Sequence, residues 1–174
     1  GCPDLPDSPL ARIVSIALPG AAIGSLFSGS ISDRIGRWWV IFIADVLFTC
    51  GAALMAFAPT IGWLMVGRLI IGLGVGAASQ IVPLYLSEVA PVEIRGKLVA
   101  FNVATITLAQ LLASCLAYGI KPHWRTMLGL AGVPSLVQLI GMFFMPESPR
   151  WLGKVGRDAD QRIVMSKIYK PEHL

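Results

Sequence analysis

Charged side chains gather in three short segments that separate long apolar runs, and their types suit ion pairing. The first segment, SDRIGRWW from Ser32 to Trp39, holds one acid and two arginines. Segments 88–97 and 147–150 also combine acids with arginine. The candidate network residues are Asp33, Arg34, Arg37, Glu88, Glu93, Arg95, Glu147 and Arg150. An exposed ion pair contributes only about 0–1 kcal/mol, but a network can bias two conformations that differ by a few kcal/mol.

Arg68 is the only charged residue in the apolar stretch 61–87. At a rise of 1.5 Å per residue, it lies about 10 Å inside that stretch if the stretch is helical. Arginine inside a membrane helix costs at least about 2.5 kcal/mol on insertion scales, so the side chain should face a cavity or an acidic partner. The alternative is that the long side chain extends back to the nearer membrane surface.

Gln110 lies about 18 Å inside the next apolar stretch, 98–120. Its amide offers two donors and an acceptor, which suits a ligand rich in hydroxyl groups. The alternative is a hydrogen bond to another helix. Asp45 is the only charged residue in stretch 38–58, and we interpret it as a structural partner to another helix, with a proton site as the alternative. Weaker polar candidates are Asn102, Thr105, Thr107, Ser114 and Gln138.

The remaining residues do not form a catalytic, metal or nucleotide motif. The segment GLGVG, 72–76, resembles a dinucleotide-binding glycine pattern, but it lies inside an apolar run without a preceding strand or a nearby acid. The basic residues, which leave a net charge of +4, sit in short loops rather than along one face, which argues against nucleic acid. We therefore expect that the protein is not an enzyme and that it binds neither a cofactor nor a metal ion.

The elements that position these residues are expected to be membrane-spanning helices. The chain has 174 residues, of which 55% are hydrophobic and 14% are charged, against about 25% charged residues in soluble domains. A helix needs about 20 apolar residues to cross a bilayer core of about 30 Å. Five stretches meet this length: 13–32, 38–58, 61–87, 98–120 and 126–146. The sequence predicts an all-α membrane protein with five transmembrane helices.

Small residues recur every four positions on two of these stretches. They are Gly20, Gly24, Ser28 and Ser32 in the first, and Gly72 and Gly76 in the third. This spacing lets helix backbones approach closely, so we predict tight packing of these faces.

Lysine and arginine mark one side of the membrane. Ten of the 14 lie in loops 33–37 and 88–97 or beyond residue 147, and three lie on the other side. The positive-inside rule then places the N-terminus outside and the C-terminus in the cytoplasm. Residues 1–12 are expected to form an extracellular loop of a longer protein. Residues 147–174 are expected to form a cytoplasmic segment with a short helix that Asp158 caps and Pro171 ends.

Three segments resemble a known family. Gly29, Asp33, Arg34, Gly36 and Arg37 match the cytoplasmic loop motif of the major facilitator superfamily. The segment GRLIIGLGVGAASQIVPLYLSEVAPVEIRGKL, 67–98, resembles the signature of its sugar porter branch, and PESPRWL, 146–152, resembles the motif that follows the sixth helix. Segments 43–48 and 133–152 are most similar to proton-coupled myo-inositol transporters.

The resemblance implies that the five stretches are helices two to six of a twelve-helix transporter, within its N-terminal six-helix bundle. Helix one and the C-terminal half would be its structural partners. It implies that an ion-pair network closes the inner gate through Asp33, Arg34, Arg37, Glu88, Arg95, Glu147 and Arg150. The alternative is positive-inside topology without gating. Trp38 departs from the family, because a basic residue is usual there.

The resemblance also implies roles for the two interior residues. Arg68 would pair with an aspartate on helix one and sense its protonation, and Gln110 would contact the sugar. Ala109 and Ala117 depart from the glycine and asparagine that are common at these positions, which leaves the substrate open.

We therefore expect part of a transporter for a sugar or polyol, myo-inositol or a hexose, that works by proton symport and alternating access. It would be a multi-pass protein in the bilayer of the plasma membrane rather than of an organelle. The alternatives are a facilitative uniporter and a truncated, non-transporting protein that acts as a regulatory partner.

Overall fold

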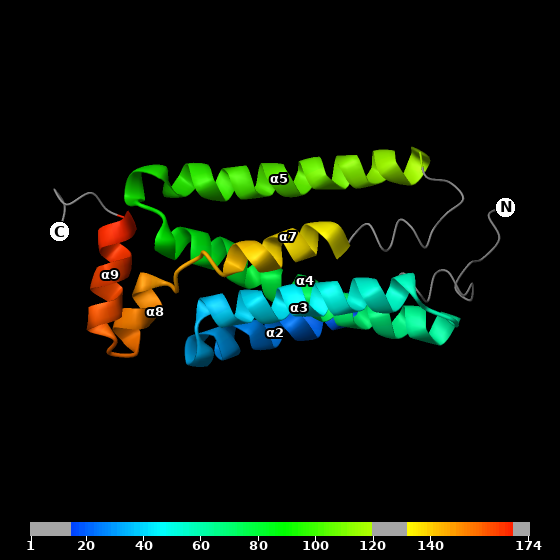
Figure 1. The fold of residues 1–174 in the computed structure, drawn as a ribbon, viewed down its shortest axis with the longest axis horizontal. Helices are drawn as coiled ribbons and strands as arrows, with labels where there is room; N and C mark the ends of the chain where they lie inside the picture. The colour runs from blue at the N-terminus through cyan, green and yellow to red at the C-terminus, as the bar shows by residue number, and fades with distance from the viewer. Residues whose placement is uncertain (1–14, 120–131, 169–174) are drawn as a thin grey trace.

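The computed structural model describes residues 15–119 and 132–168, and every regular element in these ranges is helical (Figure 1). In chain order the helices are α2 (Ala17–Ile35), α3 (Arg37–Ala56), α4 (Ile61–Val89), α5 (Val92–Gly119), α7 (Gly132–Met142), α8 (Pro149–Lys154) and α9 (Asp158–Ile168). The all-α prediction is confirmed for this part of the chain.

Helices α2 and α4 pack backbone to backbone, as the small-residue spacing predicts. A methyl group placed on Gly20 would lie 2.7 Å from the carbonyl oxygen of Leu69. One placed on Gly24 would meet the backbone of Leu73, and one on Gly76 would meet the backbone of Ala21. No larger side chain fits at these positions, so glycine is what permits the close approach.

The apolar core lies where α3, α4 and α7 meet. Its buried members are Val40 and Ile41 from α3, Ile81 and Tyr85 from α4, and Met142 from α7. Helix α5 stands apart from this core in Figure 1, and its apolar residues between 92 and 116 are not buried by the described part of the chain. The residues of α5 are therefore presented to whatever surrounds the bundle.

Within residues 15–119 and 132–168, three helices are long and apolar enough to cross a membrane by length and composition: α3, α4 and residues 92–116 of α5. Helix α2 ends in the polar sequence SDRI, and its predicted start at residue 13 lies outside the described residues. Helix α7 has 11 residues, and part of its predicted span also lies outside the described ranges. The count of five transmembrane helices stays a prediction.

The helix bounds differ from the apolar stretches. Helix α3 ends at Ala56 rather than at residue 58, α4 runs on to Val89, and α5 begins at Val92 rather than at residue 98. Helix α7 ends at Met142, before residue 146. Helices α4 and α5 extend beyond their apolar stretches because hydropathy marks contact with lipid, whereas a helix continues into water until its backbone hydrogen bonds are interrupted. Helices α3 and α7 end within their stretches, ahead of Pro59 and Pro146, because the residue before a proline disfavours the helical conformation.

The segment after residue 147 holds two short helices, α8 and α9, rather than one. They pack together through Trp151, Leu152 and Val164. Asp158 is the first residue of α9 instead of its cap, and the predicted stop at Pro171 lies outside the described residues. Both helices lie at the end of the bundle where α2 joins α3 (Figure 1).

Candidate functional site

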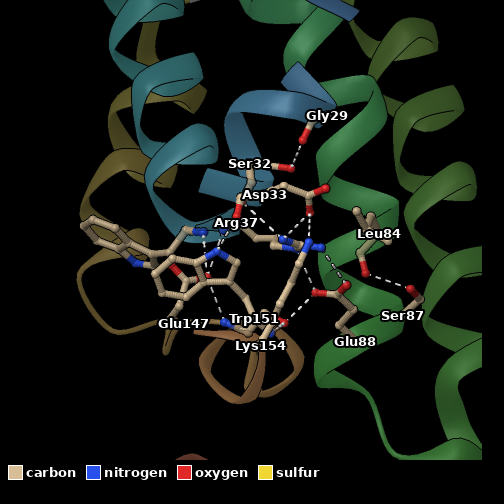
Figure 2. A network of polar contacts seen from close by, with 12 residues as sticks. Gly29, Ser32, Asp33, Arg37, Leu84, Ser87, Glu88, Glu147, Trp151 and Lys154 are labelled. Atoms are coloured by element: carbon tan, nitrogen blue, oxygen red, sulfur yellow. Dashed lines mark hydrogen bonds and ion pairs between the residues drawn. The ribbon is translucent and has the colours of Figure 1, made fainter. Parts of the chain in front are cut away.

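The candidate site is a charged cluster at this end of the bundle, formed by Asp33, Arg37, Glu88, Glu147 and Lys154 (Figure 2). Ser148 joins the cluster through its hydrogen bond to Glu88. Gly36 makes the cluster possible, because the chain turns there from α2 into α3. Gly36 has φ 105° and ψ 159° and donates its N–H to the carbonyl oxygen of Ser32 at 3.0 Å. This backbone region is essentially restricted to glycine. A methyl group at Gly36 would also collide with the carboxylate of Glu147.

Arg37 is the centre of the cluster. Its Nε donates to Oε2 of Glu88 at 3.1 Å, and its Nη2 donates to Oε1 at 3.3 Å. Its Nη1 donates to Oδ1 of Asp33 at 3.0 Å and to the carbonyl oxygen of Ser32 at 3.1 Å. The side chains of Arg37 and Glu88 are only 9% and 4% exposed. This two-pronged, buried pair joins the end of α4 to the junction of α2 and α3.

Glu147 pairs with backbone rather than with an arginine. Its Oε1 accepts from the N–H groups of Arg37 and Trp38, both at 3.0 Å, and of Ser148 at 2.8 Å. The first N–H groups of a helix have no partner within the helix, and a carboxylate there also faces the positive end of the helix dipole. Glu147 therefore caps α3 from a distant part of the chain.

Ser148 and Trp151 connect α8 to the same cluster. Ser148 is fully buried, and its hydroxyl donates to Oε2 of Glu88 and accepts from the N–H of Trp151 at 3.4 Å. The indole Nε1 of Trp151 donates to the carbonyl oxygen of Asp33 at 3.2 Å. Lys154 adds an exposed ion pair to Asp33 at 3.4 Å. A shift of α8 would thus disturb contacts on both α2 and α4.

The charges around Asp33 favour its ionised form. Desolvation alone would raise its pKa, but the hydrogen bond from Arg37 and the charge of Lys154 outweigh that effect and hold the pKa of Asp33 below its ordinary value. Asp33 therefore stays ionised at neutral pH.

Not every predicted network residue joins the cluster. Asp33, Arg37, Glu88 and Glu147 come together, whereas Arg34, Glu93 and Arg150 are exposed. Arg95 is half-buried, and its Nε has no partner in the described part of the chain. Within residues 15–119 and 132–168 none of these four forms an ion pair. Their part in a gate stays a prediction.

Sequence reasoning missed Ser148, Trp151 and Lys154. A signal for Ser148 was available, because serine followed by proline is typical of a helix N-cap with proline at the first helical position. Ser148 and Pro149 occupy these positions at the start of α8. No pattern in the sequence indicated that Trp151 would bind the end of α2.

The two interior candidates lie outside the cluster. Arg68 is half-buried on α4 and has no ion pair among residues 15–119 and 132–168. Gln110 is exposed on α5. The hydroxyls of Thr105, Thr107 and Ser114 bond to carbonyl oxygens of their own helix.

Asp45 receives a hydrogen bond from Gln138 of α7, so the interpretation of Asp45 as a partner to another helix is confirmed. Across the described ranges, no three His, Cys, Asp or Glu side chains gather as metal ligands would.

The comparisons with known proteins all point to transporters. The family described as "Sugar (and other) transporter" matches residues 4–173. The chain is 47% identical over 94% of its length to inositol transporter 4 of Arabidopsis thaliana, and covers 29% of that protein. It is 42% identical over 90% of its length to the human proton myo-inositol cotransporter, and covers 25% of it.

A solved structure has the same fold. The partially occluded, inward-open form of the xylose transporter XylE from E. coli matches with a TM-score of 0.85 at 34% identity. The match covers 92% of this chain and 44% of that structure. The chain thus spans less than half the length of the proteins that it resembles.

Proposed function

The chain belongs to the sugar transporter family of the major facilitator superfamily, and from this we propose that it forms part of a proton-coupled transporter of a sugar or polyol. Family membership and the three apolar helices indicate an integral membrane protein. We place it in the plasma membrane, with the charged cluster on the cytoplasmic side. The similarity to inositol transporters favours myo-inositol over a hexose.

The observation that carries this proposal is the buried pair of Arg37 and Glu88, held by groups from α2 and α8. Alternating access requires two conformations that differ by a few kcal/mol, so that substrate and protons can shift their populations. Removing one partner of a buried pair leaves the other charge uncompensated, and the several hydrogen bonds of such a pair are lost together when its helices separate. The cluster therefore suits a gate that closes the inner mouth.

Arg68 is our candidate for proton coupling. A half-buried arginine on a membrane helix needs an acidic partner or water. We propose that the partner is a carboxylate on a helix outside this sequence, and that protonation of this acid releases Arg68. The similarity to the human proton myo-inositol cotransporter supports coupling to protons.

Gln110 is our candidate for binding the substrate. It lies about 18 Å along α5 from residue 98, near the depth at which transporter sites usually lie. It is exposed on a helix that has little packing in this chain, so its amide is available to a hydroxyl group.

The test is uptake of labelled myo-inositol and glucose by the complete protein in proteoliposomes. We expect acid outside to accelerate uptake, and Arg68→Ala to abolish the acceleration. Gln110→Leu should raise KM about tenfold, as expected for loss of hydrogen bonds worth roughly 1–1.5 kcal/mol. Arg162→Ala, an exposed residue of α9, is the matched control and should change neither result. Uptake that ignores pH would leave a facilitative uniporter, and no uptake of either compound would refute myo-inositol and glucose as substrates.

A further inference from the structure

Helices α3 and α7 share a polar seam of four residues within the apolar part of the bundle: Asp45, Thr49, Ser135 and Gln138. Nε2 of Gln138 donates to Oδ1 of Asp45 at 2.8 Å, and the hydroxyls of Thr49 and Ser135 lie 3.1 Å apart. The spacings i,i+4 on α3 and i,i+3 on α7 put each pair on one helix face. The later residue on α3, Thr49, contacts the earlier residue on α7, Ser135, so the two contacts join antiparallel helices.

The charge state of Asp45 decides what this seam does. The residue is 1% exposed, and its Oδ2 is buried with no hydrogen-bond partner in the described part of the chain. An ionised carboxylate accepts at both oxygens and is costly in an apolar interior unless it is paired. Because the neutral amide of Gln138 is the one side-chain partner of this carboxyl group among the described residues, an ionised Asp45 would leave most of its charge uncompensated.

The charged and titratable groups of the surrounding helices do not compensate Asp45. On α3, Arg37 is bonded to Asp33 and Glu88. On α4, Glu88 is engaged in the cluster, Tyr85 donates to the carbonyl oxygen of Pro146, and Arg68 forms no ion pair with any described residue. Helix α7, GVPSLVQLIGM, contains no charged residue. Among the residues that the structure places, no cation reaches Asp45.

We propose that Asp45 is a protonated, uncharged acid that clamps α7 onto α3 through a two-bond pair with the amide of Gln138. In the neutral form Oδ2 carries the hydrogen and becomes a donor, and the amide oxygen of Gln138 is an acceptor in the same planar group that already bonds Oδ1. A carboxylic acid and a primary amide form such a pair with both of their polar edges satisfied. The ionised form offers only the single bond from Nε2.

The clamp positions a member of the charged cluster. Toward the end of α7, Nε1 of Trp38 donates to the carbonyl oxygen of Met142 at 2.8 Å, and the rings of Phe42 and Phe143 meet edge to face at 5.9 Å. Glu147 lies five residues after Met142 and caps the start of α3. Asp45 is therefore a positioning residue that holds α7 in register, so that Glu147 reaches these N–H groups. It is not a proton carrier in the transport cycle.

Infrared difference spectroscopy tests the protonation state on the complete, membrane-reconstituted protein. We expect a band from a protonated carboxyl group in the wild type that persists from pH 5 to pH 7. The band should vanish in Asp45→Asn and shift in Gln138→Leu, which removes the hydrogen-bonding partner. A wild-type band that titrates away in this range, or a wild type without such a band at pH 7, would overturn the proposal.

Stability and transport test the positioning role. Asparagine reproduces the two-bond pair, so Asp45→Asn should keep the unfolding temperature and the pH profile of uptake. Asp45→Leu and Gln138→Leu should both lower the unfolding temperature, and the double variant should lose no more than either single one. Ser25→Ala on α2, whose hydroxyl bonds to the carbonyl oxygen of Ala22 in its own helix, is the control for loss of a side-chain hydroxyl. A shifted pH profile in Asp45→Asn would show that Asp45 titrates during transport and would refute the clamp.

This proposal rests on the proposed function only in its uptake measurement. If the protein carries neither myo-inositol nor glucose, the infrared band and the unfolding temperatures still decide the state of Asp45. If uptake is found and the band is absent, the clamp fails and the transporter stands.

Discussion

Substitution of Arg37 tests whether the charged cluster stabilises the bundle. Arg37→Ala leaves the carboxylate of Glu88 buried, with the hydroxyl of Ser148 as its remaining partner. Breaking a buried ion pair by removing one member typically costs about 3–5 kcal/mol, because the other charge is left uncompensated. The exposed pair of Arg157 and Asp160, with side chains 57% and 45% exposed, is the matched control. Arg157→Ala should cost about 0–1 kcal/mol.

A double substitution separates the charge from the packing. Arg37→Met with Glu88→Leu removes both buried charges and keeps most of the volume. Such replacements are often neutral or stabilising by about 1–4 kcal/mol, so the double variant should recover most of the stability lost in Arg37→Ala. Asp33 keeps its contact with water and its ion pair to Lys154.

The assay is the free energy of unfolding of the complete protein, from denaturant titration in lipid–detergent micelles. A loss of less than about 1 kcal/mol in Arg37→Ala, no larger than in Arg157→Ala, would mean that water reaches the pair as it reaches an exposed one. The cluster would then be too weak to act as a gate. A double variant as unstable as the single one would also refute the reasoning, because stranded charge would not be the cause.

Two further predictions concern the same cluster. Gly36→Ala should destabilise the protein by about 1–3 kcal/mol or more, because of the backbone conformation of Gly36 and the collision of the methyl group with Glu147. Gly29→Ala on α2, where a methyl group meets nothing within 4 Å, should instead stabilise the protein by up to about 1 kcal/mol. The same denaturant titration measures both variants. The pKa of Asp33 is lower in the folded state than its ordinary value near 3.8. The contribution of ionised Asp33 to the free energy of unfolding should therefore be complete above that ordinary pKa, and should be lost as the pH falls below it. The difference in unfolding free energy between wild type and Asp33→Asn should therefore shrink in acid, and a difference that grows would contradict the depressed pKa.

Much of the cluster could be predicted because topology alone brings its segments together. Helices that alternate in direction bring the segments around residues 33, 88 and 147 to the same end of the bundle, whatever the details of packing. The individual contacts could not be predicted in this way. Arg34 and Arg37 lie in the same motif, yet Arg37 is buried and Arg34 is exposed, because the turn at Gly36 redirects the chain between them. Glu147 was expected in an ion pair and instead caps α3.

Composition and helical periodicity were enough to predict the helical class, the closely packed small-residue faces of α2 and α4, and the gathering of charges between the apolar stretches. These depend on composition and on periodicity within one helix, which are local properties. The three-dimensional packing was needed to show which acid pairs with Arg37, that Ser148 links α8 to α4, and that Asp45 meets Gln138, which is 93 residues away. Periodicity says which side chains share a face, whereas the packing of helices far apart in the chain decides what that face contacts.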